Sequence, residues 1–203
     1  VDFESARPSA AGESCPRRLA ARIPDRPRGA QGGERIADRV GPLSGSARDR
    51  ALAKEVLAGN VPDFLRNLTP VTVSGRRGDG RRVSVTFCVT PDYLAVGGDS
   101  DFFRVPLGLP AAAMVADRLG FLLPTTRMVD VIYQQAGVRL APQPMAPGSQ
   151  MTTTQYFWAH HQKVEGQLGG RAGSLTAGQK KDIVLSNRLR SRPGRIAIYG
   201  WHR

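Results

Sequence analysis

The sequence changes character near Ser46, and this change constrains the fold more than any other feature. Residues 1–45 are rich in Arg, Pro, Gly, Ala and Ser and hold few large apolar side chains. Such a segment buries too little apolar surface to offset the backbone entropy lost on ordering, about 1–2 kcal/mol per residue. We therefore expect a disordered arm over residues 1–45 and a single folded domain over residues 46–203.

Apolar residues beyond Ser46 alternate in some segments and recur at helical spacing in others. The alternating segments, which favour half-buried strands, are residues 71–73, 82–90, 93–96, 102–107, 183–186 and 195–201. The helical segments begin at Ser46, Pro62, Pro110, Thr125 or Thr126, and Thr152. Short turns join neighbouring strands, and we expect the strands up to residue 107 to share one sheet. The sequence thus predicts an α+β domain with a small, mainly antiparallel sheet and three to five helices.

The clearest local signal is the capping box TTTQ at residues 152–155, in which Thr152 caps a helix and Gln155 reaches back to it. His160 falls on the apolar stripe of this helix, so we expect it to pack against the core. The adjacent His161 points about 100° away and lies one turn from Glu165. His161 and Glu165 could supply two metal ligands or form a surface ion pair.

Polar residues cluster at the ends of the last two expected strands. Lys180, Lys181 and Asp182 precede one strand, and His202 follows the other. Loops beside a rigid sheet commonly hold catalytic groups, and a buried lysine can lose several pK units and act as a base. These four residues and His161 are the catalytic residues of our first hypothesis, an extracytoplasmic hydrolase-like domain. The alternative is a solvated loop ahead of a strand.

Positive charge gathers near the end of the chain. The formal net charge is +12, and residues 163–203 contribute nine basic and two acidic residues, or +7. The densest patch lies between two expected strands and consists of Arg188, Arg190, Arg192 and Arg195. Such a loop could bind the phosphates of nucleic acid or another polyanion, which gives a second hypothesis, a non-catalytic anion-binding module. Sequence-specific binding would also need a recognition helix or stacking aromatics, so a solvated hairpin loop remains the alternative.

Other patterns narrow the class of protein. Two cysteines cannot form a disulfide framework or a zinc site, and Cys88 fits an ordinary cysteine of a strand. The sequence has no glycine-rich phosphate loop, nucleophile elbow or HExxH motif, so it assigns no metal, cofactor or partner. No apolar run is long enough to span a membrane and no secretory signal is visible, which indicates a soluble domain of open location.

Five motifs resemble those of an uncharacterised family of bacterial proteins. They are PDYLAVG (residues 91–97), DFFRVPL (101–107), LPTTRMVD (123–130), GQKKDIV (178–184) and YGWH (199–202). The resemblance covers roughly residues 56–202. It implies export, because many members are exported, and an incomplete copy, because members continue beyond the last motif. Members often carry histidine where this chain has Gln179, and the family has no established activity, so the resemblance transfers no catalytic residue.

Overall fold

The folded part of the chain extends well into the segment that the sequence predicts to be disordered. The computed structural model describes residues 14–200, with helix α1 at Arg17–Ala20 and α2 at Gly33–Val40. Ile36 and Val40, one turn apart on α2, are completely buried. The boundary at residue 45 is therefore wrong: residues 14–45 hold few apolar side chains, but their spacing gives α2 a buried stripe. The rest of the expected arm, residues 1–13, lies outside the described residues.

Close backbone contact holds α2 against a strand of the core. Gly33 lies on the backbone of Phe102, and a Cβ atom at Gly33 would come within 2.2 Å of the Phe102 carbonyl carbon. Asp101 accepts a hydrogen bond of 2.9 Å from the backbone N–H of Glu34, which satisfies one of the free donors at the start of α2. A glycine and an aspartate far apart in the sequence thus fix the position of α2.

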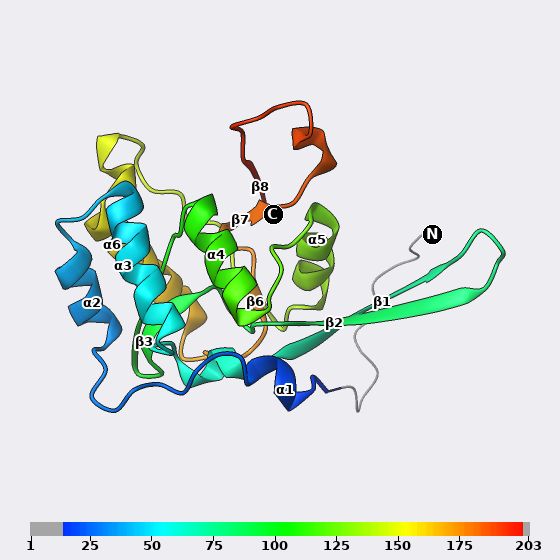
Figure 1. Ribbon diagram of the computed structural model, residues 1–203, viewed down its shortest axis with the longest axis horizontal. Helices are drawn as coiled ribbons and strands as arrows, with labels where there is room; N and C mark the ends of the chain where they lie inside the picture. The colour runs from blue at the N-terminus through cyan, green and yellow to red at the C-terminus, as the bar shows by residue number, and fades with distance from the viewer. Residues whose placement is uncertain (1–13, 201–203) are drawn as a thin grey trace.

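The longest strands form a hairpin that a disulfide ties to the N-terminal segment. β1 (Thr69–Arg76) and β2 (Arg82–Val89) pair antiparallel, as predicted, and the hairpin extends away from the helices (Figure 1). Cys88 on β2 forms a disulfide with Cys15, with 5.9 Å between the two Cα atoms. The interpretation of Cys88 as an ordinary strand cysteine is wrong, because its partner lies in the segment whose folding the sequence did not reveal.

The other strands of the described residues form three further two-stranded sheets. The antiparallel pairs are β3 (Ala95–Gly98) with β4 (Asp101–Arg104) and β7 (Lys181–Val184) with β8 (Ala197–Gly200), and the parallel pair is β5 (Val138–Arg139) with β6 (Thr176–Ala177). The predicted strands at residues 93–96 and 102–107 therefore pair with each other but do not continue the first hairpin. The reason is the bend over residues 91–93, which turns the chain away from β2.

Six α-helices lie within residues 14–200, one more than the upper limit of the predicted three to five. Two of them, α1 and α2, fall in residues 14–45, where the sequence predicts no helix. Besides α1 and α2 they are α3 (Gly45–Leu57), α4 (Leu109–Leu119), α5 (Thr126–Gln135) and α6 (Thr154–Leu168). Thr153, and not Thr152, caps α6: its hydroxyl accepts a hydrogen bond from the Tyr156 N–H, while Thr152 ends a 3-10 turn, η2 (Ser149–Thr152). The predicted fold class, a single α+β domain, is confirmed.

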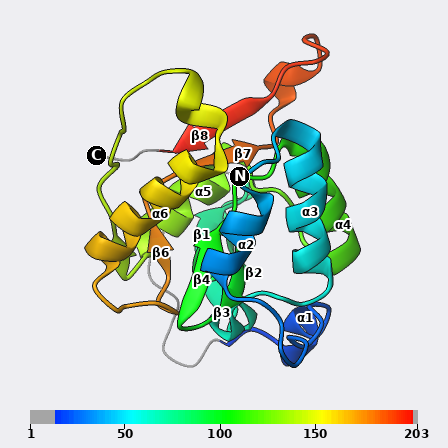
Figure 2. The ribbon, with the colours of Figure 1, turned by 90° about the vertical axis from the view of Figure 1, so that its left-hand side faces the viewer.

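The main core lies between α2, α3, α4 and the β3–β4 hairpin. Its completely buried side chains include Ile36, Leu52, Val96 and Phe103. Figure 2 shows α2 beside α6, with β4 close to both helices and β3 close to α2. A second apolar cluster joins β1 to α5. The last residue of β4 is Arg104, a charged residue that is buried in this region. The candidate site is built around it.

Candidate functional site

A buried arginine at the end of β4 organises the candidate site. The side chains of Arg104 and Asp92 are 0% and 1% exposed. Arg104 donates from Nε to both carboxylate oxygens of Asp92, at 3.2 and 3.1 Å, and from Nη2 to Oδ2. Burial lowers the pKa of Arg104, but the hydrogen bonds and charges of Asp92 and Glu165 outweigh this effect and raise it above its ordinary value. The pair is thus a charged bidentate contact inside an apolar core.

Helix α6 supplies two further partners of Arg104. Nη1 of Arg104 lies 3.2 Å from Nδ1 of His161 and also donates to Oε1 of Glu165. Because a guanidinium only donates, Nδ1 of His161 is the acceptor. His161 and Glu165 are neighbours on α6, as the spacing predicts, but they bind an arginine. Among residues 14–200, no three His, Cys, Asp or Glu side chains gather closely enough to hold a metal ion.

His161, and not His160, faces the core. The rings of Phe102, Phe103 and Trp158 lie with centroids 5.3, 6.0 and 5.1 Å from the imidazole. Burial, followed by the charge of Arg104, lowers the pKa of His161 to about 3, so the ring is neutral at pH 7. The assignment of His160 to the core is wrong, because the interior at this point contains the N–H groups of Arg104, which need an acceptor.

Gln179 completes the buried network. It is almost completely buried, and its Nε2 donates to Oδ1 of Asp92 at 3.3 Å. Its Oε1 has no hydrogen-bond partner among the described residues. A buried carbonyl without a donor destabilises a fold by about 1–3 kcal/mol.

Lys180 and His160 form a second pair at the edge of this network. Nζ of Lys180 lies 3.1 Å from Nδ1 of His160. Burial, followed by the charge of Arg104, lowers the pKa of Lys180 to about 8. Burial, followed by the charge of Lys180, lowers the pKa of His160 to about 4. Near pH 8 this half-buried pair therefore offers a neutral imidazole beside an amine that readily loses its proton.

Tyr93 joins the network to β7. Its hydroxyl lies 3.2 Å from the carbonyl oxygen of Lys180 and 3.1 Å from Oδ2 of Asp182, and it donates to both. Burial, followed by the charge of Asp182, raises the pKa of Tyr93 well above its ordinary value, so the hydroxyl keeps its proton. Since Tyr93 directly follows Asp92, one short segment positions both Arg104 and the start of β7.

The structure brings together three of the five residues in the catalytic hypothesis. His161, Lys180 and Asp182 belong to adjoining contacts around Arg104 and Tyr93. Lys181 is exposed on β7, where it pairs with Gly200 of β8. His202 lies outside the described residues.

Sequence reasoning missed Asp92, Tyr93 and Arg104, the residues that connect the others. The signal that could have revealed Arg104 is a charged residue inside the apolar segment FFRV at residues 102–105. A charge in such a segment needs a buried counter-charge, but nothing in the sequence identifies Asp92 as that partner.

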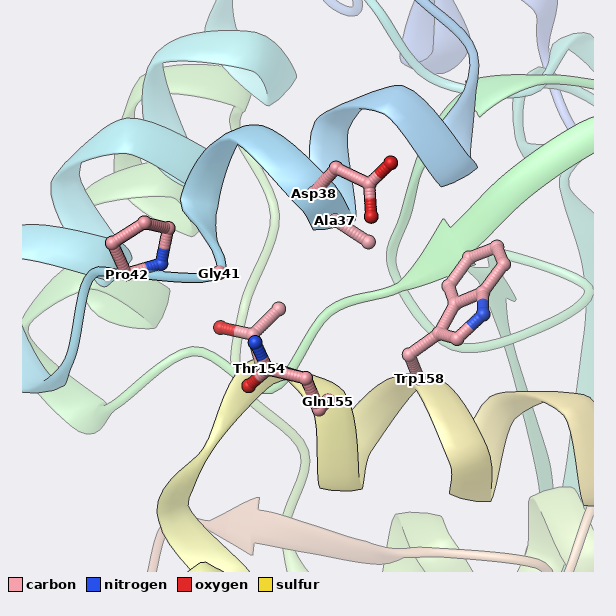
Figure 3. Close-up of a pocket in the computed structure, with 7 residues that line it drawn as sticks. All are labelled: Ala37, Asp38, Gly41, Pro42, Thr154, Gln155 and Trp158. Atoms are coloured by element: carbon pink, nitrogen blue, oxygen red, sulfur yellow. The ribbon is translucent and has the colours of Figure 1, made fainter.

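A cleft of about 360 Å³ opens between α2 and α6. Its lining residues are Ala37, Asp38, Gly41, Pro42, Thr154, Gln155 and Trp158. Figure 3 shows Trp158 on α6 and Asp38 on α2 on opposite walls. Because Trp158 also packs against His161, the cleft meets the buried network at this indole ring, while the charged groups of the network do not line it.

No family model, curated protein or solved structure matches the chain. The resemblance to an uncharacterised bacterial family therefore stays a prediction. Within residues 14–200, every helix is too short or too polar to cross a lipid bilayer.

Proposed function

We propose that this chain is an extracytoplasmic enzyme of the hydrolase type, with Lys180 as its general base. The observation that carries the proposal is the 3.1 Å contact between Nζ of Lys180 and Nδ1 of His160, beside the buried Arg104–Asp92 pair. A lysine in such surroundings releases its proton near neutral pH, and perturbed groups of this kind concentrate at functional sites.

The proposed reaction uses the neutral amine of Lys180. This amine accepts a proton from a water molecule as the water oxygen bonds to an electrophilic centre of the substrate. The ammonium so formed then returns the proton to the leaving group as the bond between that group and the centre breaks. His160 accepts a hydrogen bond from Lys180 through Nδ1 and so holds the amine in position. Arg104 is buried and touches no substrate, but its charge favours the negative charge that develops as water attacks. Tyr93 fixes the backbone of Lys180 by its hydrogen bond to the carbonyl oxygen.

Two observations support the extracytoplasmic part of the proposal. The Cys15–Cys88 disulfide is of a kind that forms and persists in oxidising compartments. The resemblance to a family with many exported members points the same way.

An NMR titration of the lysine Nζ groups tests the base directly. The chain has four lysines, Lys54, Lys163, Lys180 and Lys181. We expect one resonance to titrate near pH 8, because burial lowers the pKa of Lys180 to about 8. This resonance should disappear in Lys180→Met and remain in Lys181→Met. Four lysines that all titrate near the ordinary value of about 10.4 would contradict the proposal.

Hydrolysis of chromogenic esters, amides and phosphodiesters tests the reaction. The rate should rise with pH through about 8, because the unprotonated amine is the active form. The Lys180→Met variant should lose activity. The Lys181→Met variant should keep its activity, because Lys181 is exposed on β7 and has no role in the proposed reaction. A loss of activity in this variant would instead make Lys181 part of the catalytic site. Equal hydrolysis by Lys180→Met and the unmodified protein would exclude Lys180 as the base.

A further inference from the structure

One face of the β7–β8 hairpin is apolar and exposed to solvent. Ile183 and Ile198 lie opposite each other in this antiparallel pair, and opposite residues point to the same face. Leu185 and Ile196 occupy the next positions outward and so extend the same face. Leu185, Ile196 and Ile198 are 51%, 54% and 60% exposed. Exposed apolar side chains that adjoin one another mark interaction surfaces more often than single scattered ones do.

The opposite face of the hairpin is packed against the protein. Val184 on this face is buried, and the hydroxyl of Tyr199 donates a hydrogen bond of 2.9 Å to Oδ1 of Asp130 on α5. The hairpin is therefore anchored on one side, and the exposed apolar face is the outer side of a fixed element.

A strongly basic loop borders this apolar face. The loop between β7 and β8 carries Arg188, Arg190, Arg192 and Arg195, and all four are exposed. Residues 183–203 contain no acidic residue. None of the four arginines forms an ion pair with another residue in the described range 14–200. Four positive charges thus adjoin the exposed aliphatic side chains without local neutralisation.

We propose that the outer face of the β7–β8 hairpin, formed by Leu185, Ile196, Ile198 and the arginine loop, docks on an anionic phospholipid surface. Aliphatic side chains can enter the boundary between headgroups and acyl chains, while neighbouring arginines bind the lipid phosphates. The loop between β7 and β8 projects from the body of the protein in both Figure 1 and Figure 2, so a flat surface can reach the arginines that it carries.

The chemistry of this surface favours lipid over nucleic acid. Arginines alone fit either phosphate-bearing partner. Single-stranded nucleic acids, however, are bound with aromatic side chains on which bases stack, whereas the hydroxyl of the nearby Tyr199 is held by Asp130 of α5. Leucine and isoleucine provide no stacking surface or base-edge hydrogen bond, whereas burial in a lipid interface removes them from water.

Co-sedimentation with vesicles tests the inference on the full chain. We expect binding to vesicles of equal parts phosphatidylglycerol and phosphatidylcholine, and little binding to phosphatidylcholine alone. Since a basic residue at such a surface contributes about 1 kcal/mol, the triple variant R188A/R190A/R192A should partition about 100-fold more weakly. The double variant I196S/I198S should also lose most of its binding, because it removes apolar side chains and leaves the charge unchanged.

The turn of the β1–β2 hairpin offers a matched control. It carries the exposed Arg77, Arg81 and Arg82, so R77A/R81A/R82A removes the same charge from a different hairpin. This variant should bind the anionic vesicles nearly as well as the unmodified protein, and circular dichroism should show that all the variants remain folded. Equal loss in both arginine triples would reduce the effect to overall charge and overturn the inference.

Two other results would overturn it as well. Binding to duplex DNA or heparin that I196S/I198S leaves unchanged, without vesicle binding, would assign the arginine loop to a polyanion. A dimer in analytical ultracentrifugation that I196S/I198S converts to monomer, again without vesicle binding, would assign the apolar face to a second copy of the chain.

Discussion

Arg104 and Asp92 form a bidentate ion pair whose two side chains are almost completely shielded from solvent. Removing two charges from water is costly, and a well-packed apolar pair could occupy the same space at no loss of stability. Burial is the main cause of the low pKa values of His161 and Lys180, and the charge of Arg104 lowers both further, whereas the charge of Asp92 raises the pKa of Lys180. Arg104 therefore adds to the electrostatics of the site, while Asp92 compensates its charge inside the core.

Replacement of Asp92 with Asn tests the energetic part of this relationship. It should destabilise the protein by about 3–5 kcal/mol, because the charge of Arg104 would stay buried without its main partner. Asp63→Asn is the control: Asp63 pairs with Arg66 but its side chain is 72% exposed, so the loss should stay below about 1 kcal/mol. Urea unfolding followed by circular dichroism measures both. Similar losses in the two variants would mean that Glu165 and His161 suffice to compensate Arg104.

Local signals allowed much of the fold to be predicted from the sequence. α4 and α6 end at Gly120 and Gly169, which adopt left-handed φ angles of 71° and 58° that favour glycine. The β1–β2 hairpin follows from alternation and a glycine-containing turn. These features depend on residues close together in the chain, so period and turn chemistry are enough to reveal them.

The candidate site could be predicted only in part, because its central contacts join distant residues. Arg104 and Glu165 are 61 residues apart, and Asp92 and Gln179 are 87 apart. No periodicity encodes such pairs. The same limit explains the error over residues 14–45, where composition suggests too little apolar surface. There, packing depends on Gly33 meeting the backbone of Phe102, a contact that composition does not report.

Gly33→Ala tests whether α2 belongs to the core. The new methyl group would lie 2.2 Å from a backbone atom of Phe102, which cannot move aside as a flexible side chain could. We expect a loss of at least about 2 kcal/mol through this clash. Gly166→Ala on α6 is the matched control, since nothing lies within 4 Å of its added Cβ and alanine favours helix by about 0.5–1 kcal/mol. A neutral Gly33→Ala measured by thermal unfolding would contradict the packing of α2.

Reduction of the disulfide should loosen the N-terminal segment. The Cys15–Cys88 bond joins residues that are separated by 73 positions in the sequence. A disulfide typically stabilises a fold by about 2–4 kcal/mol, because it restricts the unfolded chain. We expect the C15S/C88S variant and the reduced protein to unfold at the same lower urea concentration. A thiol assay under denaturing conditions should find no free cysteine before reduction and two afterwards, since the chain has two cysteines. Two free thiols in protein purified from an oxidising compartment would contradict the bond.

Acid should destabilise the protein before most carboxylates titrate. The pKa of His161 is about 3 in the folded protein against an ordinary value of 6.5, so the unfolded chain binds more protons between these values. This contribution to stability is present above about pH 6.5 and decreases as the pH falls. Between about pH 6.5 and 5 we expect a loss of about 1.5 kcal/mol from His161, and less from the half-buried His160. Urea unfolding of the unmodified protein and of His161→Gln at both pH values measures this loss. The loss between the two pH values should be smaller in the variant, whatever its absolute stability. An equal loss would show that His161 is already protonated in the folded state.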